Sequence, residues 1–294
     1  MSPAQHWIEA ARPQTLPAAV IPVMVGTALA AAHRLADYGH AAICLAFALL
    51  VQIGTNFAND YFDFVQGADT PARVGPRRAV AAGLIPPRAM LAATWLVLGL
   101  AFAIGLLLVG EGGWMLLPIG LVSLACAIAY TGGPFPLGYN GLGDVFVFVF
   151  FGLVAVCTTF YVQTGQVTSD VVSCAAAVGL LAANILVANN YRDAETDARA
   201  GKKTLVVRFG RRFAVWQYAL SHAVALLCPA SLFLTGAYRW PVLLPVVLAP
   251  AAVLLTRRLA VSREPAEQIA LLGRTAAYLA AFGSLLSVGV VLGK

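Results

Sequence analysis

Long apolar runs constrain the fold of this chain more than any other feature of its sequence. About nine segments are long and apolar enough to cross a bilayer as helices, at residues 16–32, 41–58, 89–109, 114–130, 142–161, 171–188, 213–234, 241–255 and 270–292. Only 11% of the 294 residues are charged, whereas soluble domains carry about a quarter. We therefore predict an all-α, polytopic membrane bundle that forms a single domain over residues 1–294.

Basic residues are distributed unevenly between the two faces that these spans define. Of nineteen lysines and arginines, only Arg34, Arg239 and Lys294 fall on one face. Lys and Arg near span ends favour the cytoplasmic side, so the other face is predicted to be cytoplasmic, together with the N-terminus. The net charge of +6 then reflects topology and anion binding, and we expect no nucleic-acid partner because no soluble basic domain is present.

Two acidic segments stand at the ends of apolar runs. The segment NFANDYFD ends at Asp63 and NNYRDAETD ends at Asp197, and together they hold five of the thirteen acidic residues. Ionised groups beside hydrocarbon are costly unless something pairs with them. The segments lie four spans apart, and an even number of crossings returns the chain to the same face. We expect them to face each other across one central cavity, capped by two cytoplasmic loops of about twenty residues.

Within each segment, the oxygen-bearing side chains recur at helical spacing and share one face. The two sets are Asn56, Asp60 and Asp63, and Asn189, Asp193 and Asp197. Facing carboxylate and amide oxygens suit Mg²⁺, which commonly completes its shell with water and substrate phosphate oxygens. The structural alternative is that these carboxylates accept hydrogen bonds from loop amides at helix ends.

Basic side chains follow both acidic segments on the same face. They are Arg73, Arg77 and Arg78 after the first segment, and Lys202, Lys203 and Arg208 after the second. Some serve the positive-inside pattern alone, and the others are candidates to hold phosphate oxygens. About two magnesium ions bridging a diphosphate would neutralise the charge on a departing pyrophosphate. An apolar helical cavity suits a diphosphate with a long lipid tail, and an allylic prenyl diphosphate ionises to a delocalised carbocation.

Aromatic residues near the acidic segments are candidates to stabilise such a cation and exclude water. They are Tyr61, Phe64, Tyr139, Phe146 and Phe148. Aromatic residues in membrane helices more often serve packing or interface anchoring. Tyr139 is the individual residue that we favour.

The acidic motifs NDYFD at residues 59–63 and YRDAETD at residues 191–197 resemble those of the UbiA-type intramembrane aromatic prenyltransferases. A narrower resemblance, to the 1,4-dihydroxy-2-naphthoate polyprenyltransferases of menaquinone biosynthesis, is carried in order by ARPQTLPAAVIPVMVGTALA, TNFANDYFDFVQGADT, VGPRRAV, YTGGPFPLGYNGLGD and NNYRDAETDARAGKKTLVVRFG. It implies nine spans, dependence on Mg²⁺, and a multi-pass protein of a bacterial plasma or inner membrane. The implied reaction joins polyprenyl diphosphate to 1,4-dihydroxy-2-naphthoate with loss of CO₂ and pyrophosphate, giving demethylmenaquinone.

The resemblance also implies roles for individual residues. Metal ligands are expected at Asn56, Asp60, Asp63, Asp193 and Asp197, and the catalytic set comprises these four aspartates and Lys203. By motif match, Arg77, Lys203 and Arg208 are expected on the diphosphate. The position and chemistry of the residues themselves add Asn56, Asn59, Arg73, Arg78, Asn189 and Lys202 as candidates. Some relatives carry a further Asp four residues after the second Asp of the first motif, where this chain has Gly67. The first ligand set is therefore expected to rely on Asn56 or water.

The acceptor site is less visible in the sequence. Arg12 and Arg73 are candidates to bind the carboxylate of the acceptor, although Arg12 also suits an interfacial anchor beside Trp7. Asp144 is a candidate to handle an acceptor proton, or else a carboxylate that favours a helix start. The four histidines lie outside both acidic segments, so nothing supports a histidine base.

Other functions remain open at this point. A UbiA-type enzyme with 4-hydroxybenzoate or homogentisate as acceptor would carry the same motifs. A membrane transporter could also place acidic residues in its spans, but transporter sites lie near the bilayer midplane in interrupted helices. Both acidic segments here lie at span ends, which favours an enzyme.

Overall fold

The computed structural model describes residues 2–69, 75 and 77–294, and its secondary structure is helical. The elements of the first half are α1 (Pro3–Ala11), η1 (Pro13–Thr15), α2 (Pro17–Ala32), α3 (Tyr38–Val65), α4 (Pro87–Gly112), α5 (Leu116–Ala129) and α6 (Gly143–Val147). Those of the second half are η2 (Phe148–Val154), α7 (Ala155–Thr164), α8 (Ser169–Arg199), α9 (Leu205–Leu234), η3 (Trp240–Leu248), α10 (Ala249–Val261) and α11 (Pro265–Gly293).

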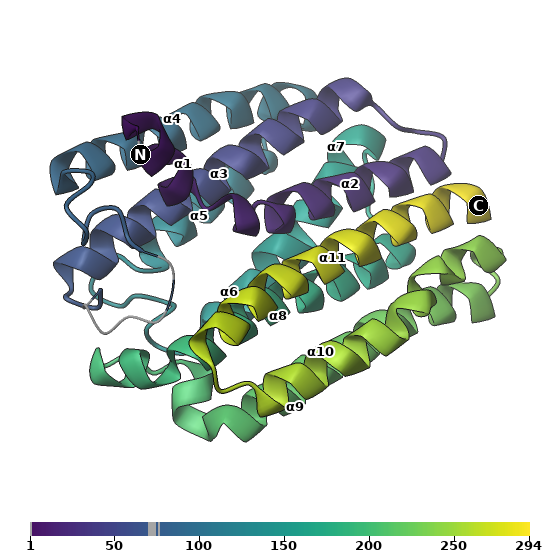
Figure 1. Cartoon of the computed structure of the whole chain (residues 1–294). Helices are drawn as coiled ribbons and strands as arrows, with labels where there is room; N and C mark the ends of the chain where they lie inside the picture. Colours follow the sequence, from purple (N-terminus) through teal and green to yellow (C-terminus); the bar gives the residue numbers. More distant parts are fainter. Residues whose placement is uncertain (1, 70–74, 76) are drawn as a thin grey trace.

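The long helices run side by side along one direction and form an elongated bundle (Figure 1). In the described part of the chain, seven helical segments are long and apolar enough to cross a membrane, and the bent pair Pro3–Thr15 and Pro17–Ala32 makes an eighth. The shorter apolar helix α5 covers the remaining predicted run. The predicted all-helical, polytopic bundle is therefore confirmed.

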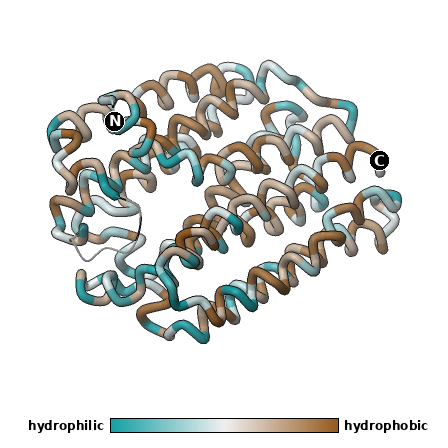
Figure 2. The backbone as a smooth tube through the Cα atoms, viewed as in Figure 1, coloured by the Kyte–Doolittle hydropathy of each residue, from teal (hydrophilic) through white to brown (hydrophobic). Residues whose placement is uncertain are grey.

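The core of the bundle is built around α8. Within the apolar window of this helix, 72% of the residues are buried, a larger share than in the other candidate spans. Small residues allow the neighbouring chain to approach closely: a Cβ on Gly152 of η2 would lie 2.6 Å from the Cα of Gly179. The η2 segment has wide, π-helical turns, which are frequent at functional sites. Hydropathy follows this layout, with apolar residues along the helices and polar residues at their ends (Figure 2).

The N-terminal helix is bent away from the first span. Segments Pro3–Thr15 and Pro17–Ala32 meet at 52°. The bend begins at Arg12, whose φ of 52° lies in the left-handed region, and prolines at positions 13 and 17 fit the first turns of the helices that follow. The ring of Trp7 packs edge-on against Phe57 of α3, with centroids 5.4 Å apart. The bend therefore places Arg12 beside α3.

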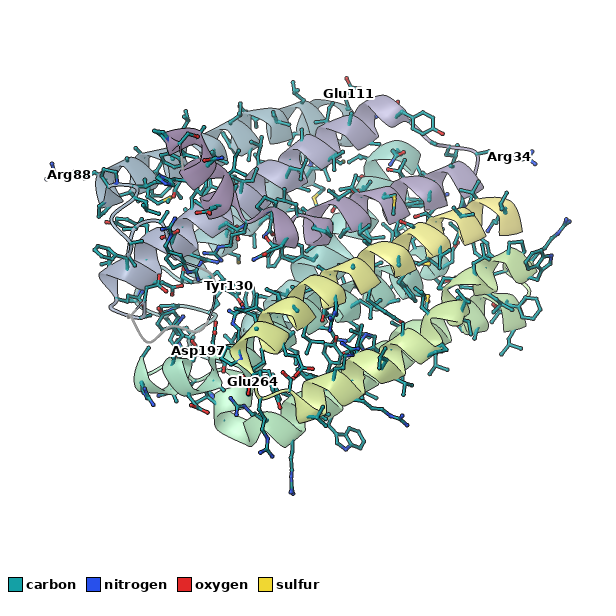
Figure 3. The ribbon with its side chains drawn as sticks, viewed as in Figure 1. Arg34, Arg88, Glu111, Tyr130, Asp197 and Glu264 are labelled. Atoms are coloured by element: carbon teal, nitrogen blue, oxygen red, sulfur yellow. The ribbon has the colours of Figure 1, made fainter. Side chains whose placement is uncertain are left out.

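Both acidic segments lie at the same end of the bundle, where α3 and α8 finish. We call this the motif end. The opposite end of the bundle, where α8 begins, is called the Asp170 end. Arg88 and Asp197 lie at or near the motif end and Arg34 lies at the other (Figure 3). The second acidic segment differs from expectation in one respect, because α8 continues to Arg199 and only residues 200–204 separate it from α9. The apolar run ends well before the helix does, since Ala, Glu and Arg propagate a helix outside hydrocarbon.

Candidate active site

A cavity of about 340 Å³ opens between α2, α3, α4, α5, η2 and α8. Its charged and amide lining is concentrated at the motif end and includes Arg12, Asn56, Asn59, Asp63, Arg78, Asn189, Asn190, Asp193, Asp197 and Lys202. Its apolar lining continues toward the opposite end and includes Val23, Cys44, Leu108, Leu116, Phe150 and Val154. A ligand that fits this cavity has a charged head and a long apolar tail.

Asp63 is the most heavily hydrogen-bonded carboxylate of the first motif. Its Oδ1 accepts from the Tyr139 hydroxyl at 2.6 Å and from Lys202 Nζ at 3.1 Å. Its Oδ2 accepts from Arg78 Nη2 at 3.2 Å. Because three donors converge on a carboxylate that is only 3% exposed, its negative charge is neutralised without solvent.

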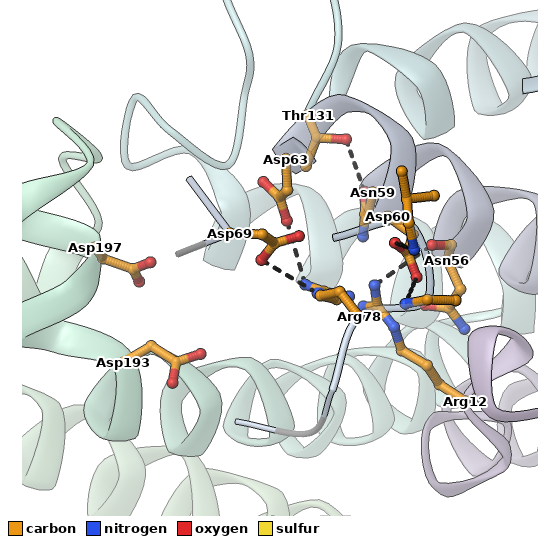
Figure 4. A network of polar contacts seen from close by, with 12 residues as sticks. Arg12, Asn56, Asn59, Asp60, Asp63, Asp69, Arg78, Thr131, Asp193 and Asp197 are labelled. Carbon is orange, nitrogen blue, oxygen red and sulfur yellow. Dashed lines mark hydrogen bonds and ion pairs between the residues drawn. The ribbon is translucent and has the colours of Figure 1, made fainter. Parts of the chain in front are cut away.

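Asp69 belongs to the same network and was not identified from the sequence. Arg78 Nε lies 3.5 Å from Asp69 Oδ1, and the Asp69 side chain is 1% exposed. Gly67, with φ of 70°, turns the chain after α3 so that Asp69 comes back toward Asp63 (Figure 4). Asp69 therefore pairs with the same arginine as Asp63, although the cavity lining does not include it. An acidic residue in the loop was the only available signal.

Asp60 lies behind this network and is 1% exposed. Its two oxygens accept backbone N–H bonds from Ala79 at 3.0 Å and Val80 at 3.1 Å. The cavity lining includes its neighbours Asn59 and Asp63 but not Asp60. In this structure Asp60 therefore fastens the chain after the first motif to α3, which is the structural alternative raised from the sequence.

The two asparagines of the first motif line the cavity and also join neighbouring elements. Asn56 Nδ2 donates to the carbonyl of Ala11 at 2.8 Å and to Thr15 Oγ1 at 3.1 Å, which fixes the bend after α1. Asn59 Oδ1 accepts from Thr131 Oγ1 at 2.9 Å. Both amides keep further hydrogen-bonding capacity toward the cavity.

The second motif projects from the last turns of α8 toward the first (Figure 4). Arg192 donates two hydrogen bonds to the Asp193 carboxylate, from Nε at 2.8 Å and from Nη2 at 2.6 Å. Its Nη2 also donates to Asn189 Oδ1 at 2.8 Å. Arg192 is 3% exposed, and its position in the sequence gives no sign of this role. Asp197 lies at the cavity, 3.7 Å from Lys202 Nζ.

Lys202 connects the two motifs. Gly201, with φ of 75°, ends α8 in a left-handed turn, and the Lys202 amide donates to the carbonyl of Asp197. This turn directs the ammonium between Asp63 and Asp197, where it also lies 4.5 Å from the centre of the Tyr139 ring. Burial and the adjacent Asp63 carboxylate raise the pKa of the Tyr139 phenol, so Tyr139 remains a hydrogen-bond donor.

Several other predicted residues lie around the cavity rather than in its lining. Arg77 pairs with Glu9 at 3.5 Å on the exposed rim, and Arg208 Nη2 donates to the Asn140 carbonyl at 2.9 Å. Lys203 is exposed, and its backbone amide donates to the carbonyl of Tyr139. Asp144 accepts from Gln217 Nε2 at 2.8 Å. Tyr61 packs in a hydrophobic cluster with Phe57. The other predicted residue, Arg73, lies outside the described residues.

The donor atoms at the motif end fit a hard cation that shares its shell with a ligand. Asp63, Asp193, Asp197 and Asn56 offer oxygen atoms to one cavity. Within the described residues, no three His, Cys, Asp or Glu side chains are grouped closely enough to hold a metal by themselves. That combination suits Mg²⁺, which is usually bound by one or two carboxylates together with substrate phosphates and water.

Comparisons with known proteins agree with this geometry. A model of the UbiA prenyltransferase family matches residues 19–288. The 1,4-dihydroxy-2-naphthoate octaprenyltransferase of Haemophilus influenzae is 34% identical over 98% of this chain and 96% of its own. The enzyme of the same name from Mycobacterium tuberculosis is 45% identical over 71% of this chain and 72% of its own.

Solved structures show the same fold at low sequence identity. A UbiA homolog from Archaeoglobus fulgidus, bound to DMAPP and Mg²⁺, superposes with a TM-score of 0.63 at 18% identity, covering 96% of this chain and 99% of that one. A UbiA homolog from Aeropyrum pernix gives a TM-score of 0.63 at 15% identity, covering 99% and 98%.

Proposed function

The chain belongs to the UbiA prenyltransferase family, and on that premise we propose that it transfers a polyprenyl chain from polyprenyl diphosphate to 1,4-dihydroxy-2-naphthoate. The observation that carries this proposal is the cavity in which Asp63 of α3 and Asp197 of α8 share one bridging lysine. The relatives that bear this acceptor in their names cover most of the chain. The ring would exchange its carboxylate for the prenyl chain, so that CO₂ and pyrophosphate leave. The transfer itself needs no redox partner and yields the dihydroxy (quinol) form, and demethylmenaquinone forms when an external oxidant then removes two electrons and two protons.

The diphosphate is proposed to bind at the motif end together with about two magnesium ions. Asn56, Asp63, Asp193 and Asp197 would hold the ions, with Asp60 bracing the chain behind them. Bound Mg²⁺ would neutralise the charge that builds on the departing pyrophosphate. Outer phosphate oxygens would be held by the cavity residues Asn59, Arg78, Asn189 and Lys202, with Arg77, Lys203 and Arg208 nearby.

The prenyl tail is proposed to lie in the apolar part of the cavity. Tyr139 lines the cavity next to Asp63, at the point where the allylic carbon would lose pyrophosphate. Its ring face can stabilise the carbocation, and Phe146 and Phe150, which stack with centroids 5.8 Å apart, line the wall below. An apolar wall excludes water, which would otherwise capture the cation.

The acceptor is proposed to enter beside the bend after α1. Arg12 lines the cavity and its Nη2 lies 3.4 Å from the carbonyl of Asn56, which places a guanidinium at this wall where an acceptor carboxylate could pair with it. Tyr61 and Asp144 would act on the acceptor only indirectly, through residues of the cavity lining, because that lining does not include them.

We propose that the motif end faces the cytoplasm of a bacterial plasma or inner membrane. The positive-inside pattern supports this orientation, because Arg34, Arg239 and Lys294 are the only lysines and arginines at the other face among the described residues. Arg88→Cys and Arg34→Cys, in a background whose five cysteines are replaced by alanine, test it. An impermeant maleimide added to intact cells should label only Arg34→Cys, and labelling of only Arg88→Cys would reverse the orientation.

A substrate panel tests the proposed reaction. Purified protein is given Mg²⁺, octaprenyl diphosphate and one of three acceptors, and both pyrophosphate and CO₂ are measured. With 1,4-dihydroxy-2-naphthoate, equal amounts of both products should form. Turnover with 4-hydroxybenzoate or homogentisate in its place would reassign the acceptor, and absence of turnover with all three would reject the proposal.

A further inference from the structure

Lys202 occupies the space between the two motifs in a way that points to a role before the substrate arrives. Its Nζ lies 3.1 Å from Asp63 Oδ1 and 3.7 Å from Asp197 Oδ1, and its side chain is 13% exposed. One ammonium thus satisfies carboxylates that come from α3 and α8. From this bridge, and resting on the proposed function, we infer that Lys202 is an exchangeable counter-ion that makes metal and diphosphate bind together.

The reasoning starts from charge. Asp63 and Asp197 lie on either side of one ammonium, and two carboxylates that share a poorly solvated site repel each other. Lys202 relieves that repulsion by lying between the two motifs, and so it occupies the side of Asp63 and Asp197 that a shared metal ion would use. A divalent ion that arrives alone has to displace the ammonium, which then loses both partners inside the site.

A diphosphate changes this balance. Its oxygens offer Lys202 a new anionic partner, so the ammonium can leave Asp63 and Asp197 and remain paired. The carboxylates that it leaves are then available to the metal ions that the diphosphate also binds. The two ligands therefore favour each other through Lys202, and by linkage the coupling is the same in either order of addition.

Arg192 shows why the exchange is assigned to Lys202. Arg192 binds its sequence neighbour Asp193 through two parallel hydrogen bonds and is 3% exposed, which is a rigid and local arrangement. Lys202 instead makes single contacts to two carboxylates 134 positions apart in sequence numbering, Asp63 and Asp197. A flexible side chain with single contacts can move to a new partner without rebuilding its surroundings.

The test measures binding without turnover. Mn²⁺ binding to the purified full chain is followed by electron paramagnetic resonance, first alone and then with saturating geranylgeranyl diphosphate and no acceptor. In the wild type, the diphosphate should raise Mn²⁺ affinity strongly. In Lys202→Met, Mn²⁺ alone should bind about tenfold more tightly, and the enhancement by diphosphate should fall by a similar factor.

Two further variants control the experiment. Arg199→Met removes an equal charge from the exposed last residue of α8, three positions before Lys202, and should leave both Mn²⁺ measurements near the wild-type values. Lys202→Arg keeps the charge and should restore weak binding of Mn²⁺ alone, even if the Lys202→Met protein proves less stable.

The outcomes separate the two proposals. Wild-type binding of both ligands, with Mn²⁺ affinity in Lys202→Met unchanged or weakened, overturns the counter-ion role and leaves the proposed function standing. Failure of the wild type to bind Mn²⁺ in the presence of the prenyl diphosphate overturns the proposed function and the inference with it. Equal tightening in Arg199→Met and Lys202→Met also overturns the inference, because general charge would then explain the effect.

Discussion

The two ends of the bundle contain the same trio of side chains. At the motif end, the Tyr139 hydroxyl donates to Asp63 and Lys202 lies over the Tyr139 ring, 4.5 Å from its centre. At the Asp170 end, the Tyr238 hydroxyl donates to Asp170 at 2.5 Å and Lys294 lies 4.6 Å from the centre of the Tyr238 ring. Burial and the neighbouring carboxylate raise the phenol pKa in both Tyr139 and Tyr238.

What surrounds each trio differs. Asp170 is completed by His33 at 3.0 Å and by Thr168, so it joins α2, the start of α8 and the segment after α9. The cavity lining includes Asp63, Tyr139 and Lys202 but none of the residues around Asp170. The motif end adds a second carboxylate and an open cavity, whereas the Asp170 end closes on itself. An Asp–Tyr–Lys trio therefore indicates function only where a ligand can reach it.

The largest expected contrast comes from the two central carboxylates. Asp63→Asn should lower turnover about 10³-fold while the protein still folds, because the negative charge that would attract the metal ions is lost. Asp170→Asn should lower thermal stability and leave turnover per folded enzyme nearly unchanged. Pyrophosphate release and thermal unfolding of the purified variants measure both. A similar loss of turnover in the two variants would erase the distinction between the ends.

Asp60 tests whether a residue of the first acidic motif can serve folding and not metal binding. Asp60→Asn weakens one of two backbone contacts, to Ala79 or Val80, so the free energy of unfolding should fall by about 1–3 kcal/mol. Turnover should fall as well, but less than in Asp63→Asn. Thermal unfolding and pyrophosphate release are again compared. Full loss of turnover with unchanged stability would instead make Asp60 a direct metal ligand.

The two tyrosines provide a matched pair with a smaller effect. Tyr139→Phe removes the donor to Asp63 but keeps the ring, and should lower turnover about tenfold. Tyr238→Phe removes the donor to Asp170 and should lower the free energy of unfolding by about 1–2 kcal/mol without changing turnover. Steady-state kinetics and thermal unfolding distinguish the two. An effect of Tyr238→Phe on kcat would show that the Asp170 end communicates with the cavity.

The smallest change is expected at Lys294. Its Nζ lies 4.0 Å from Asp170 Oδ2 and its side chain is 36% exposed, so Lys294→Met should cost about 0.5 kcal/mol of stability or less. Lys202→Met removes the corresponding lysine of the motif end and should alter metal binding. A stability loss in Lys294→Met as large as that in Asp170→Asn would mean that the terminal lysine holds the Asp170 cluster together.

Much of this arrangement was predictable from the helical spacing of the motif residues and from the even number of spans between the two motifs. The helical spacing of Asn56 and Asp63 brings both to the cavity, whereas Asp60, expected on the same stripe, lies behind it, and the even number of spans between the motifs brings Asp197 to the same end. Tyr139, favoured on its position in the sequence, does contact Asp63. These inferences depend only on regular geometry, which a sequence pattern encodes directly.

The remaining contacts depend on irregular backbone and on side-chain reach. Hydropathy locates the end of the apolar run near Ala188 but not the end of α8 at Arg199. Asp69 joins the site because Gly67 turns the loop and Arg78 reaches both carboxylates. The two hydrogen bonds from Arg192 to Asp193 join sequence neighbours at a buried helix end. Residue spacing alone does not predict them.

The shortness of α5 has a consequence for the surrounding lipid. Leu116–Ala129 has 14 residues, which at about 1.5 Å per residue cover about 21 Å, whereas the hydrocarbon layer is about 30 Å thick. Beside this helix the leaflets must draw closer together, or flanking residues must enter the acyl region. Since Leu117, Gly120 and Leu124 of α5 also line the cavity, this mismatch falls where a lipid tail would lie. Catalytic rate in reconstituted vesicles should then vary with the acyl-chain length of the host phospholipid.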